Sequence, residues 1–524
     1  MRQPIKAAPI LIFLLFLGLA MLIGLAVPLL PMKISTIFGL MIITTLGIVI
    51  ALLLPAQNAV PERTIAVLLI LGIASKFLWP SFSYIPLPGL PTKNPQRLIW
   101  AICILYWVYS LMVNKTLRER LATRLAHSRT SLLVGIFFFW RFLAIFNSDY
   151  PDVSLRIYLL ELFDYAPAYL FALTWLKDSI DVKRITTALV VVLIGIECMT
   201  LVEAITKSNL FLALVPIDSS SEEFLAAATE TKMRAGAYRA QASFNHPLLL
   251  AQFAVTALPL VLAGILARGQ STRKSLSILA ALGIPMILWA TQTRTAMASA
   301  AVVIVAAGLL TAFNAATKKG QGFGRNIAGV IALLAGVLIA IAAAFLVYVL
   351  ASGRTAEESG STFARIQMLQ LAMGAAADSW LFGYGPGVGG YKGALTSSNG
   401  RASLDSQMLS QLLDAGVVAM VVYALFFVQA AKRFVMLRSF VDSDSGLIQA
   451  MWCLSVFVFG FTSLVLSTPH NMPLMFFGMG VVVVLRASTK PIDQVGALLK
   501  DRILRSGFSD SAVDTQKTTR RQAT

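Results

Sequence analysis

Charged side chains are scarce in this chain: Asp, Glu, Lys and Arg together make up only 13% of its 524 residues. Hydrophobic residues make up 57%, and the mean hydropathy is +0.77. Soluble domains carry about 25% charged residues, so the composition excludes an ordinary soluble protein and predicts an all-α polytopic membrane protein. An open sheet is excluded from the hydrocarbon core, because its edge groups would find no hydrogen-bond partner there.

Cysteine and histidine are also rare, with three residues of each type. Cys103, Cys198 and Cys453 all lie within apolar runs and have no pair spacing, so they are predicted to be small core residues. The histidines show no pair at metal-ligand spacing. No G-x-S-x-G, Walker A or H-E-x-x-H motif is present. The sequence therefore predicts neither a metal site nor a cofactor.

Long apolar runs predict about fourteen transmembrane helices, since a helix needs about 20 apolar residues to cross a bilayer. The runs lie near 9–30, 34–55, 61–79, 97–113, 131–146, 157–176, 185–206, 244–267, 274–291, 295–313, 327–350, 408–430, 446–467 and 472–486. They divide the chain into N-terminal helices 1–206, a first outer loop 207–243, central helices 244–350, a large outer loop 351–407, C-terminal helices 408–487 and a basic, partly disordered tail 488–524.

The distribution of Lys and Arg predicts that both termini are cytoplasmic, because cytoplasmic loops carry an excess of these residues. Arg2 and Lys6 precede the first apolar run as in a signal peptide. The length of that run and the absence of a small-residue cleavage site favour an uncleaved first helix. The formal net charge of +18 is explained by topology and anionic lipid, and we expect no nucleic-acid partner.

Two hydrophilic stretches, Ser208–Ala242 and Ala351–Gln407, place arginines on the outer face, which normally avoids positive charge. Within the second stretch, Thr362–Asp378 has apolar residues at helical spacing. We expect an amphipathic helix at the outer interface, with Arg365 in its first turn. Arg365 is either a snorkelling interfacial side chain or a ligand for an anion.

Further along the same stretch, Gly383–Gly390 contains the letters of the G-x-G-x-x-G dinucleotide pattern. We reject that function because no βαβ unit surrounds the segment. The glycines either let backbone N–H groups approach a ligand or form a structural turn. Asp405 precedes the next apolar run, so it is either the N-cap of that helix or a carboxylate that faces a reaction centre.

Arg294 lies in the turn Thr291–Thr295 between two apolar runs, so it must meet water, a lipid phosphate or a substrate phosphate. Arg141 falls inside an apolar run, where a charge is costly and indicates pairing or function. A structural ion pair is the favoured explanation, and its candidate carboxylate partners are Glu161, Asp164, Glu197 and Glu203. His246 and His470 lie at outer helix ends.

Three of these segments together resemble the bacterial O-antigen ligase and polymerase family of integral membrane glycosyltransferases. They are Tyr238–Pro247 (YRAQASFNHP), Gln292–Ala296 (QTRTA), and Arg365 followed by Trp380–Gly387 (WLFGYGPG). The likeness covers about residues 230–480, and the segment Trp79–Arg97 resembles members found in exopolysaccharide gene sets. Where ligases usually carry a His-Asn pair, this chain has Leu404-Asp405-Ser406, and a His-Asn dipeptide occurs only at His470-Asn471, one helical hairpin later.

The resemblance implies a glycosyltransferase C-type membrane fold in the bacterial inner membrane and a polymerase that joins polyprenyl-diphosphate-linked oligosaccharides. The implied partners are an undecaprenyl-diphosphate-linked glycan donor, a glycan acceptor, membrane lipids and, as candidates, a chain-length regulator or export proteins. Arg294 and Arg365 would clamp the diphosphate with help from Arg239, and Asp405 would act as the base. Candidates for further contacts are His246, Tyr384, Arg401 and His470. Ligation of the glycan to lipid A core or to protein, and transport by a flippase, remain alternatives.

Overall fold

The computed structural model describes residues 62–80, 82, 94–211, 232–234, 236–267, 271–317, 356–393, 395–396, 402–437, 443–467 and 469–488. The predicted spans near 9–30, 34–55 and 327–350, the residue Arg401 and the tail from 489 onward lie outside these ranges. Within them the chain is helical apart from two short hairpins, which confirms the all-α prediction.

Every predicted span between 61 and 313 and between 408 and 486 coincides with a helix. The membrane-type helices are α3 Glu62–Leu78, α4 Pro95–Val113, α6 Arg129–Ala144, α7 Pro151–Trp175, α8 Ser179–Thr206, α10 Pro247–Leu266, α11 Ser271–Thr291, α12 Arg294–Thr317, α16 Gln407–Met436, α17 Asp444–Ser463 and α18 Met472–Ser488. In the described part of the chain, 8 helices are long and apolar enough to cross a membrane. The protein is therefore a multi-pass membrane protein.

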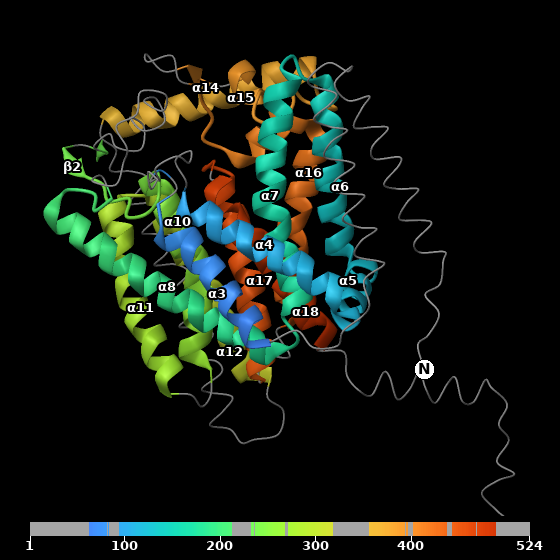
Figure 1. The fold of residues 1–524 in the computed structure, drawn as a ribbon. Helices are drawn as coiled ribbons and strands as arrows, with labels where there is room; N and C mark the ends of the chain where they lie inside the picture. Colours follow the sequence, from blue (N-terminus) through green and yellow to red (C-terminus); the bar gives the residue numbers. More distant parts are fainter. Residues whose placement is uncertain are drawn as a thin grey trace, which may run out of the picture.

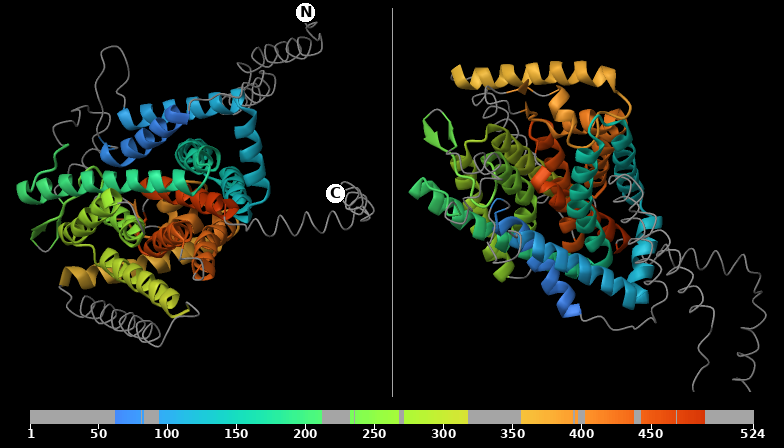
Figure 2. Two further views of the ribbon diagram at one scale, coloured as in Figure 1. Left: turned by 90° about the horizontal axis from the view of Figure 1, so that it is seen from below. Right: turned by 45° about the horizontal axis from the view of Figure 1, so that its top comes forward.

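The remaining elements are short or lie beside the bundle. They are α5 Lys115–Ala126, α14 Ala356–Asp378, α15 Gly389–Gly393, the 3-10 helices η2 Ile145–Asn147 and η6 Pro469–Asn471, and two antiparallel hairpins, β1 Met233–Arg234 with β2 Ala237–Tyr238 and β3 Leu395–Thr396 with β4 Ala402–Ser403. Figures 1 and 2 show α14 lying across one end of the bundle. We call this end, which the sequence predicts to be outer, the α14 end.

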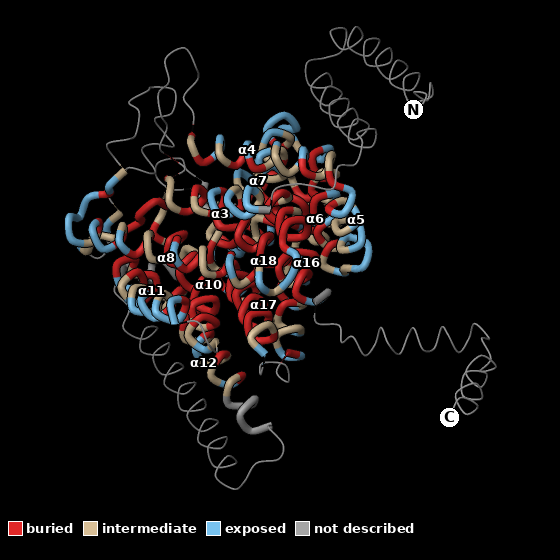
Figure 3. Tube along the Cα trace, turned by 60° about the horizontal axis from the view of Figure 1, so that its bottom comes forward, coloured by how far each residue is buried: buried red, intermediate tan, exposed pale blue. Residues whose placement is uncertain are grey.

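Helices α10 and α17 form the centre of the bundle, and 83% of the apolar window of each is buried. They pack against each other, while α18 packs on α7 and α16 packs on α6 and α17. Figure 3 shows the buried residues concentrated on these central helices and many exposed ones on peripheral α5 and α11. An aromatic cluster links the helices: the ring of Phe137 lies 5.8 Å from that of Phe426 and 5.9 Å from that of Phe476.

Helix α5 was not predicted, because its sequence is too polar to give a membrane signal. The side chain of Asn114 accepts a hydrogen bond from the Leu117 N–H at 3.2 Å and so caps the N-terminus of α5. Arg124 on α5 donates through Nη1 to the carbonyls of Leu173 and Leu176, both at 2.6 Å. These carbonyls lie at the C-terminus of α7, where a cation satisfies the unpaired acceptors of the last turn.

Helix α16 is broken near its N-terminus, and the glycine-rich run docks into the break. Gly416 has φ of 75°, and a Cβ there would lie 2.0 Å from the carbonyl oxygen of Leu381. The N–H groups of Tyr384 and Gly385 donate to the carbonyls of Leu413 and Asp414 at 2.8 and 2.9 Å. These N–H groups are committed to α16, so this geometry favours the structural-turn alternative for the run.

Candidate functional site

Arg239 meets the turn before α12 and thereby approaches Arg294. Its Nε donates to the carbonyl oxygen of Thr291 at 2.8 Å, and its Nη2 donates to Oγ1 of Thr293 at 3.3 Å. Arg294 is the next residue and opens α12. Arg239 therefore contacts the turn that precedes Arg294, although the two segments lie about 50 residues apart in the sequence.

The segment that carries Arg239 is folded around the buried carboxylate of Glu203, at the end of α8. One oxygen of Glu203 accepts from the Tyr238 hydroxyl at 2.8 Å and from the Gln241 N–H at 3.1 Å. The other accepts from the Ala242 N–H at 2.6 Å. Burial of a carboxylate is tolerable when its lone pairs are satisfied in this way. Sequence reasoning missed this role, although a carboxylate in the last turn of an apolar helix beside a polar loop was the available signal.

His246 lies beside this segment as the N-cap of α10, which confirms that it begins a helix. Its Nδ1 accepts a hydrogen bond from the Leu248 N–H at 3.2 Å. Burial and the nearby charges of Arg239 and Lys232 lower the pKa of His246 to about 4. His246 is therefore neutral at pH 7, and Lys232, whose carbonyl accepts from the Arg239 N–H at 2.9 Å, is a further cation that sequence reasoning missed.

His470 approaches the same segment from the other side. Its ring lies edge-to-face on Phe244, with the ring centroids 5.6 Å apart. Burial and the charge of Lys76 lower the pKa of His470 to about 4. The neighbouring Asn471 is fully buried and donates to the Leu249 carbonyl and to Gln252 Oε1 at 2.9 and 3.0 Å. Both residues of the His-Asn dipeptide therefore pack inside the bundle, against the segment and helix that follow Arg239.

Arg365 lies on the face of α14 that turns toward the protein. Met368, Ala372 and Ala376 follow it at helical spacing and are buried, with 6%, 0% and 6% exposure. Phe363 and Met373 are exposed at 68% and 54%. Most of the apolar residues predicted to form one face of this helix are therefore exposed, as expected of a helix at a membrane interface. The Nε of Arg365 is buried and has no hydrogen-bond partner among the described residues.

The other predicted site residues have different surroundings. Ser406, whose side chain accepts from the Leu409 N–H at 3.4 Å, caps α16, so the prediction that Asp405 is the N-cap is wrong. The Tyr384 hydroxyl donates to the Ala375 carbonyl at 2.7 Å and ties the glycine run to α14. Arg401 lies outside the described residues.

Arg141 belongs to a separate, internally neutralised network. It is 1% exposed, and its Nη2 lies 2.5 Å from Glu161 and 3.6 Å from Asp414. This confirms the predicted ion pair with Glu161. Two of the other candidate partners are engaged elsewhere: Asp164 pairs with Lys76 at 2.9 Å, and Glu203 holds the Tyr238–Ala242 segment.

The geometry therefore defines one basic site at the α14 end, which we call the Arg239 site: Lys232, Arg239, His246, Thr293 and Arg294. The carbonyl oxygen of Thr291 and the hydroxyl of Thr293 orient the Arg239 side chain within this site. An arginine side chain held in this manner suits a phosphate or diphosphate.

Comparison with protein families identifies the region around this site. Residues 253–424 match the family described as O-antigen ligase. We call residues 253–424, which make up about a third of the chain, the O-antigen ligase region. The O-antigen ligase region contains Arg294, Arg365, Tyr384 and Asp405, and it ends shortly after the break in α16. Arg239, His246 and His470 lie outside the matched residues. No curated protein matches the chain.

The match is to a family whose description implies a glycosyltransferase-type activity that uses a lipid-linked glycan and an acceptor. The family match agrees with the sequence resemblance, and the matched residues include two of the three segments that carry the resemblance, those around Arg294 and Arg365.

Proposed function

We propose that the protein is a polymerase that joins oligosaccharide repeat units carried on a polyprenyl diphosphate, at the outer leaflet of a bacterial inner membrane. In this proposal the fold is of the glycosyltransferase C type, with about fourteen spans and both termini in the cytoplasm. The observation that carries the proposal is the contact of Arg239 with the turn before Arg294, beside Lys232 and at the border of the O-antigen ligase region.

The reaction breaks the bond between the anomeric carbon of the donor glycan and the diphosphate oxygen. A new bond forms between that carbon and a hydroxyl oxygen of the acceptor glycan. The hydroxyl proton passes to a base, and the polyprenyl diphosphate leaves with the bonding electrons. Charge grows on the diphosphate as the bond breaks, so cations that contact it stabilise the transition state more than the ground state.

The described contacts support particular roles for the arginines. Two neutral oxygens hold the guanidinium of Arg239, so its orientation is fixed before the donor arrives. Arg294 is at the first residue of α12, where the helix dipole adds to the attraction for an anion. Arg365, on the inward face of α14, would close over the diphosphate from the outer side.

Asp405 is our proposed base. It is half-buried, lies in the connection before α16, and is not the cap of that helix. We expect Asp405→Asn to lower turnover by about 10²–10⁴-fold while donor binding changes little, because the amide cannot accept the proton. An unchanged turnover number in that variant would remove Asp405 from the mechanism.

The deciding experiment incubates the purified protein with a lipid-linked repeat unit, without nucleotide, once in EDTA and once in buffer. Glycans of two or more repeats on the polyprenyl carrier would support polymerisation. Transfer only to added lipid A core would instead support ligation, the activity in the name of the matched family. Movement of unmodified donor between leaflets of a proteoliposome, with no new glycosidic bond, would support a flippase and overturn the proposal.

A further inference from the structure

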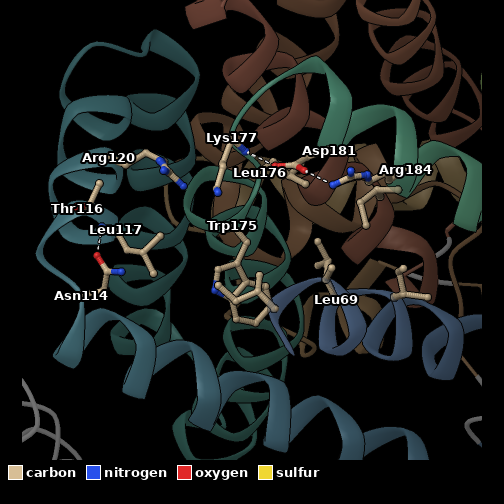
Figure 4. A pocket seen from close by; sticks show the side chains of 14 residues that line it. Leu69, Asn114, Thr116, Leu117, Arg120, Trp175, Leu176, Lys177, Asp181 and Arg184 are labelled. Atoms are coloured by element: carbon tan, nitrogen blue, oxygen red, sulfur yellow. Dashed lines mark hydrogen bonds and ion pairs between the residues drawn. The ribbon is translucent and has the colours of Figure 1, made fainter. Parts of the chain in front are cut away.

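A cavity of about 360 Å³ lies at the end of the bundle opposite α14, where α7 ends and α8 begins. We call it the Arg120 cavity. Figure 4 shows its charged side chains along one side and apolar side chains along the other. The charged side, which we call the rim, comprises Arg120, Lys177, Asp181 and Arg184, and the apolar side, which we call the wall, includes Leu69, Ile70, Leu117 and Trp175. The volume suits a small molecule, since such sites measure about 300–1,000 Å³.

The three arginines of α5 differ in how many carbonyl groups of the protein they contact. Arg118 donates to two carbonyls at the C-terminus of α4, at 2.8 and 2.6 Å, and Arg124 donates to three at and just beyond the C-terminus of α7. Arg120 makes one such bond, from Nη1 to the Thr174 carbonyl at 3.1 Å. Its Nε and Nη2 have no hydrogen-bond partner among the residues that the structure describes. The arginine of α5 that lines the cavity therefore retains donors for a ligand.

Arg184, on α8, provides the second guanidinium group of the rim. Its Nη1 lies 3.4 Å from Asp181, one turn earlier on the same helix, and its side chain is 72% exposed. Asp181 is the only acidic side chain among the described residues that line the cavity, and it also accepts from the Lys177 N–H at 3.0 Å. Two guanidinium groups therefore face one carboxylate, which leaves the rim positive even when the charge of Lys177 is not counted. Such a rim favours an anion.

Two further carboxylates lie close to the rim in the sequence but do not line the cavity. Asp178 caps α8 by accepting from the N–H groups of Ile180 and Asp181 at 2.8 and 3.2 Å. Glu119 lies 3.7 Å from Lys115 on an exposed face of α5. Both carboxylates have partners of their own, so they do not neutralise the rim.

The wall determines what kind of anion fits the Arg120 cavity. Trp175 is held in place, because its Nε1 donates to Ser110 Oγ at 3.4 Å and its ring stacks on that of Phe171 with the centroids 4.6 Å apart. Ile70 and its neighbour Leu71 are 37% and 48% exposed, so the wall continues into the apolar outer surface of α3. A fully hydrated anion would gain nothing from this wall. A molecule with an anionic head and acyl chains satisfies both the rim and the wall.

We propose that the Arg120 cavity binds one phospholipid with a net negative headgroup, taken from the leaflet at that end of the bundle. The phosphate lies between Arg120 and Arg184, whose planar groups suit its oxygens. The first part of the acyl chains lies along Leu69, Ile70 and Trp175. The cavity is at the opposite end of the bundle from the Arg239 site, so the proposal does not depend on the polymerase activity.

The test titrates the full-length protein in detergent with dioleoylphosphatidylglycerol and follows binding by native mass spectrometry. Dioleoylphosphatidylcholine and inorganic phosphate serve as the zwitterionic and lipid-free probes. We expect one phosphatidylglycerol to bind at least about tenfold more tightly than phosphatidylcholine, with inorganic phosphate at millimolar concentration leaving it in place. Equal affinity for the two lipids would overturn the proposal. Displacement of the lipid by inorganic phosphate would also overturn it, in favour of a small-anion site.

Two double variants separate a built site from diffuse attraction. Arg120→Gln/Arg184→Gln removes two charges from the rim and should weaken phosphatidylglycerol binding about tenfold or more. Arg129→Gln/Lys274→Gln removes the same charge from exposed residues that do not line the cavity, and it should stay within about twofold of the wild type. Equal losses in both variants would show that diffuse charge, and not the cavity, attracts the lipid.

A change in the wall tests the site without altering its charge or the contact of Arg120 with α7. Ala66, on α3, lines the cavity, so Ala66→Trp should fill part of it and weaken phosphatidylglycerol binding about tenfold. Val67→Trp is the matched control, because Val67 is 54% exposed and does not line the cavity. That control should bind within about twofold of the wild type. Unchanged binding in Ala66→Trp would place the lipid elsewhere and overturn the proposal.

Discussion

Arg141, which is buried, and Arg239, which is half-buried, both lie at the α14 end of this protein but have different hydrogen-bond acceptors around them. Arg141 is neutralised by Glu161 and Asp414, at 2.5 and 3.6 Å. Arg239 is held by the Thr291 carbonyl and the Thr293 hydroxyl, and lies close to Lys232 and His246. Both side chains are ordered by oxygen acceptors, and in these contacts the acceptors are carboxylates for Arg141 and neutral oxygens for Arg239.

The difference underlies our proposal that Arg141 is structural and that Arg239 binds a ligand. A buried charge is costly unless it is paired, and a pair whose partner is removed leaves an uncompensated charge behind. Arg141 sits at a junction of α6, α7 and α16, where an ion pair can hold three helices together. In the contacts given above, Arg239 is oriented by a carbonyl and a hydroxyl oxygen, an arrangement that suits the anion-binding role we propose for it.

The largest effect is expected for Arg141→Ala. The change leaves Glu161 and Asp414 without their cation, and it should lower the free energy of unfolding by about 3–5 kcal/mol. The measurement is thermal or denaturant unfolding in detergent, with Arg156→Ala as the control because Arg156 is exposed on α7. If both variants had the same midpoint as the wild type, Arg141 would not have the structural role assigned to it.

Arg294→Ala and Arg239→Ala should give the reverse pattern. We expect each to lower polymer formation by about 10²–10³-fold, the usual effect of removing one preorganised charge-stabilising donor, and to leave the midpoint of unfolding nearly unchanged. The assay is the lipid-linked repeat incubation described above, again with Arg156→Ala as the control. Normal glycan length in both variants would exclude the Arg239 site as the diphosphate site.

A third prediction concerns pH. His246 has a pKa of about 4 in the folded protein, below its ordinary value of 6.5. The unfolded chain therefore binds a proton that the folded protein does not, and this stability is present above about pH 6.5 and lost as the pH falls toward 4. Lowering the pH from 7 to 5 should therefore reduce the free energy of unfolding by about 2 kcal/mol through His246.

Denaturant unfolding of the wild type and of His246→Gln at both pH values checks this prediction. The variant should lose less stability on acidification, although His470 retains its own lowered pKa of about 4 in both proteins. Identical pH dependence of the two proteins would contradict the prediction, because it would mean that folding does not lower the pKa of His246.

The smallest effect is expected for Tyr384→Phe. This change removes the hydrogen bond from the Tyr384 hydroxyl to the Ala375 carbonyl, which is 2.7 Å long and joins the glycine run to α14. The cost should be about 0.5–1.5 kcal/mol in the free energy of unfolding, with a smaller change in activity than for Arg294→Ala. A loss of activity as large as that of Arg294→Ala, at unchanged stability, would instead make the Tyr384 hydroxyl a substrate contact.

Short stretches of the sequence were sufficient to predict most of the helices. The apolar runs predicted the spans between 61 and 313 within a few residues, and the Gln292–Thr293 turn is as short as expected between α11 and α12. Helix α5 was missed because a short basic helix has no apolar run to reveal it. Asp405 and Ser406 show the limit of sequence spacing, since either residue type can cap a helix and only the geometry distinguishes them.

The amino-acid sequence by itself determined the class of protein, the positions of most of its described spans and the arginines at their ends, because hydropathy and charge are properties of short segments. Only the tertiary structure decided which of these arginines contacts carboxylates and which contacts a carbonyl and a hydroxyl oxygen. That outcome depends on carboxylates and carbonyls from distant segments, as with Glu203 beneath Tyr238–Ala242 and Asp414 beside Arg141. No local pattern encodes such pairings, since they exist only after the helices have packed.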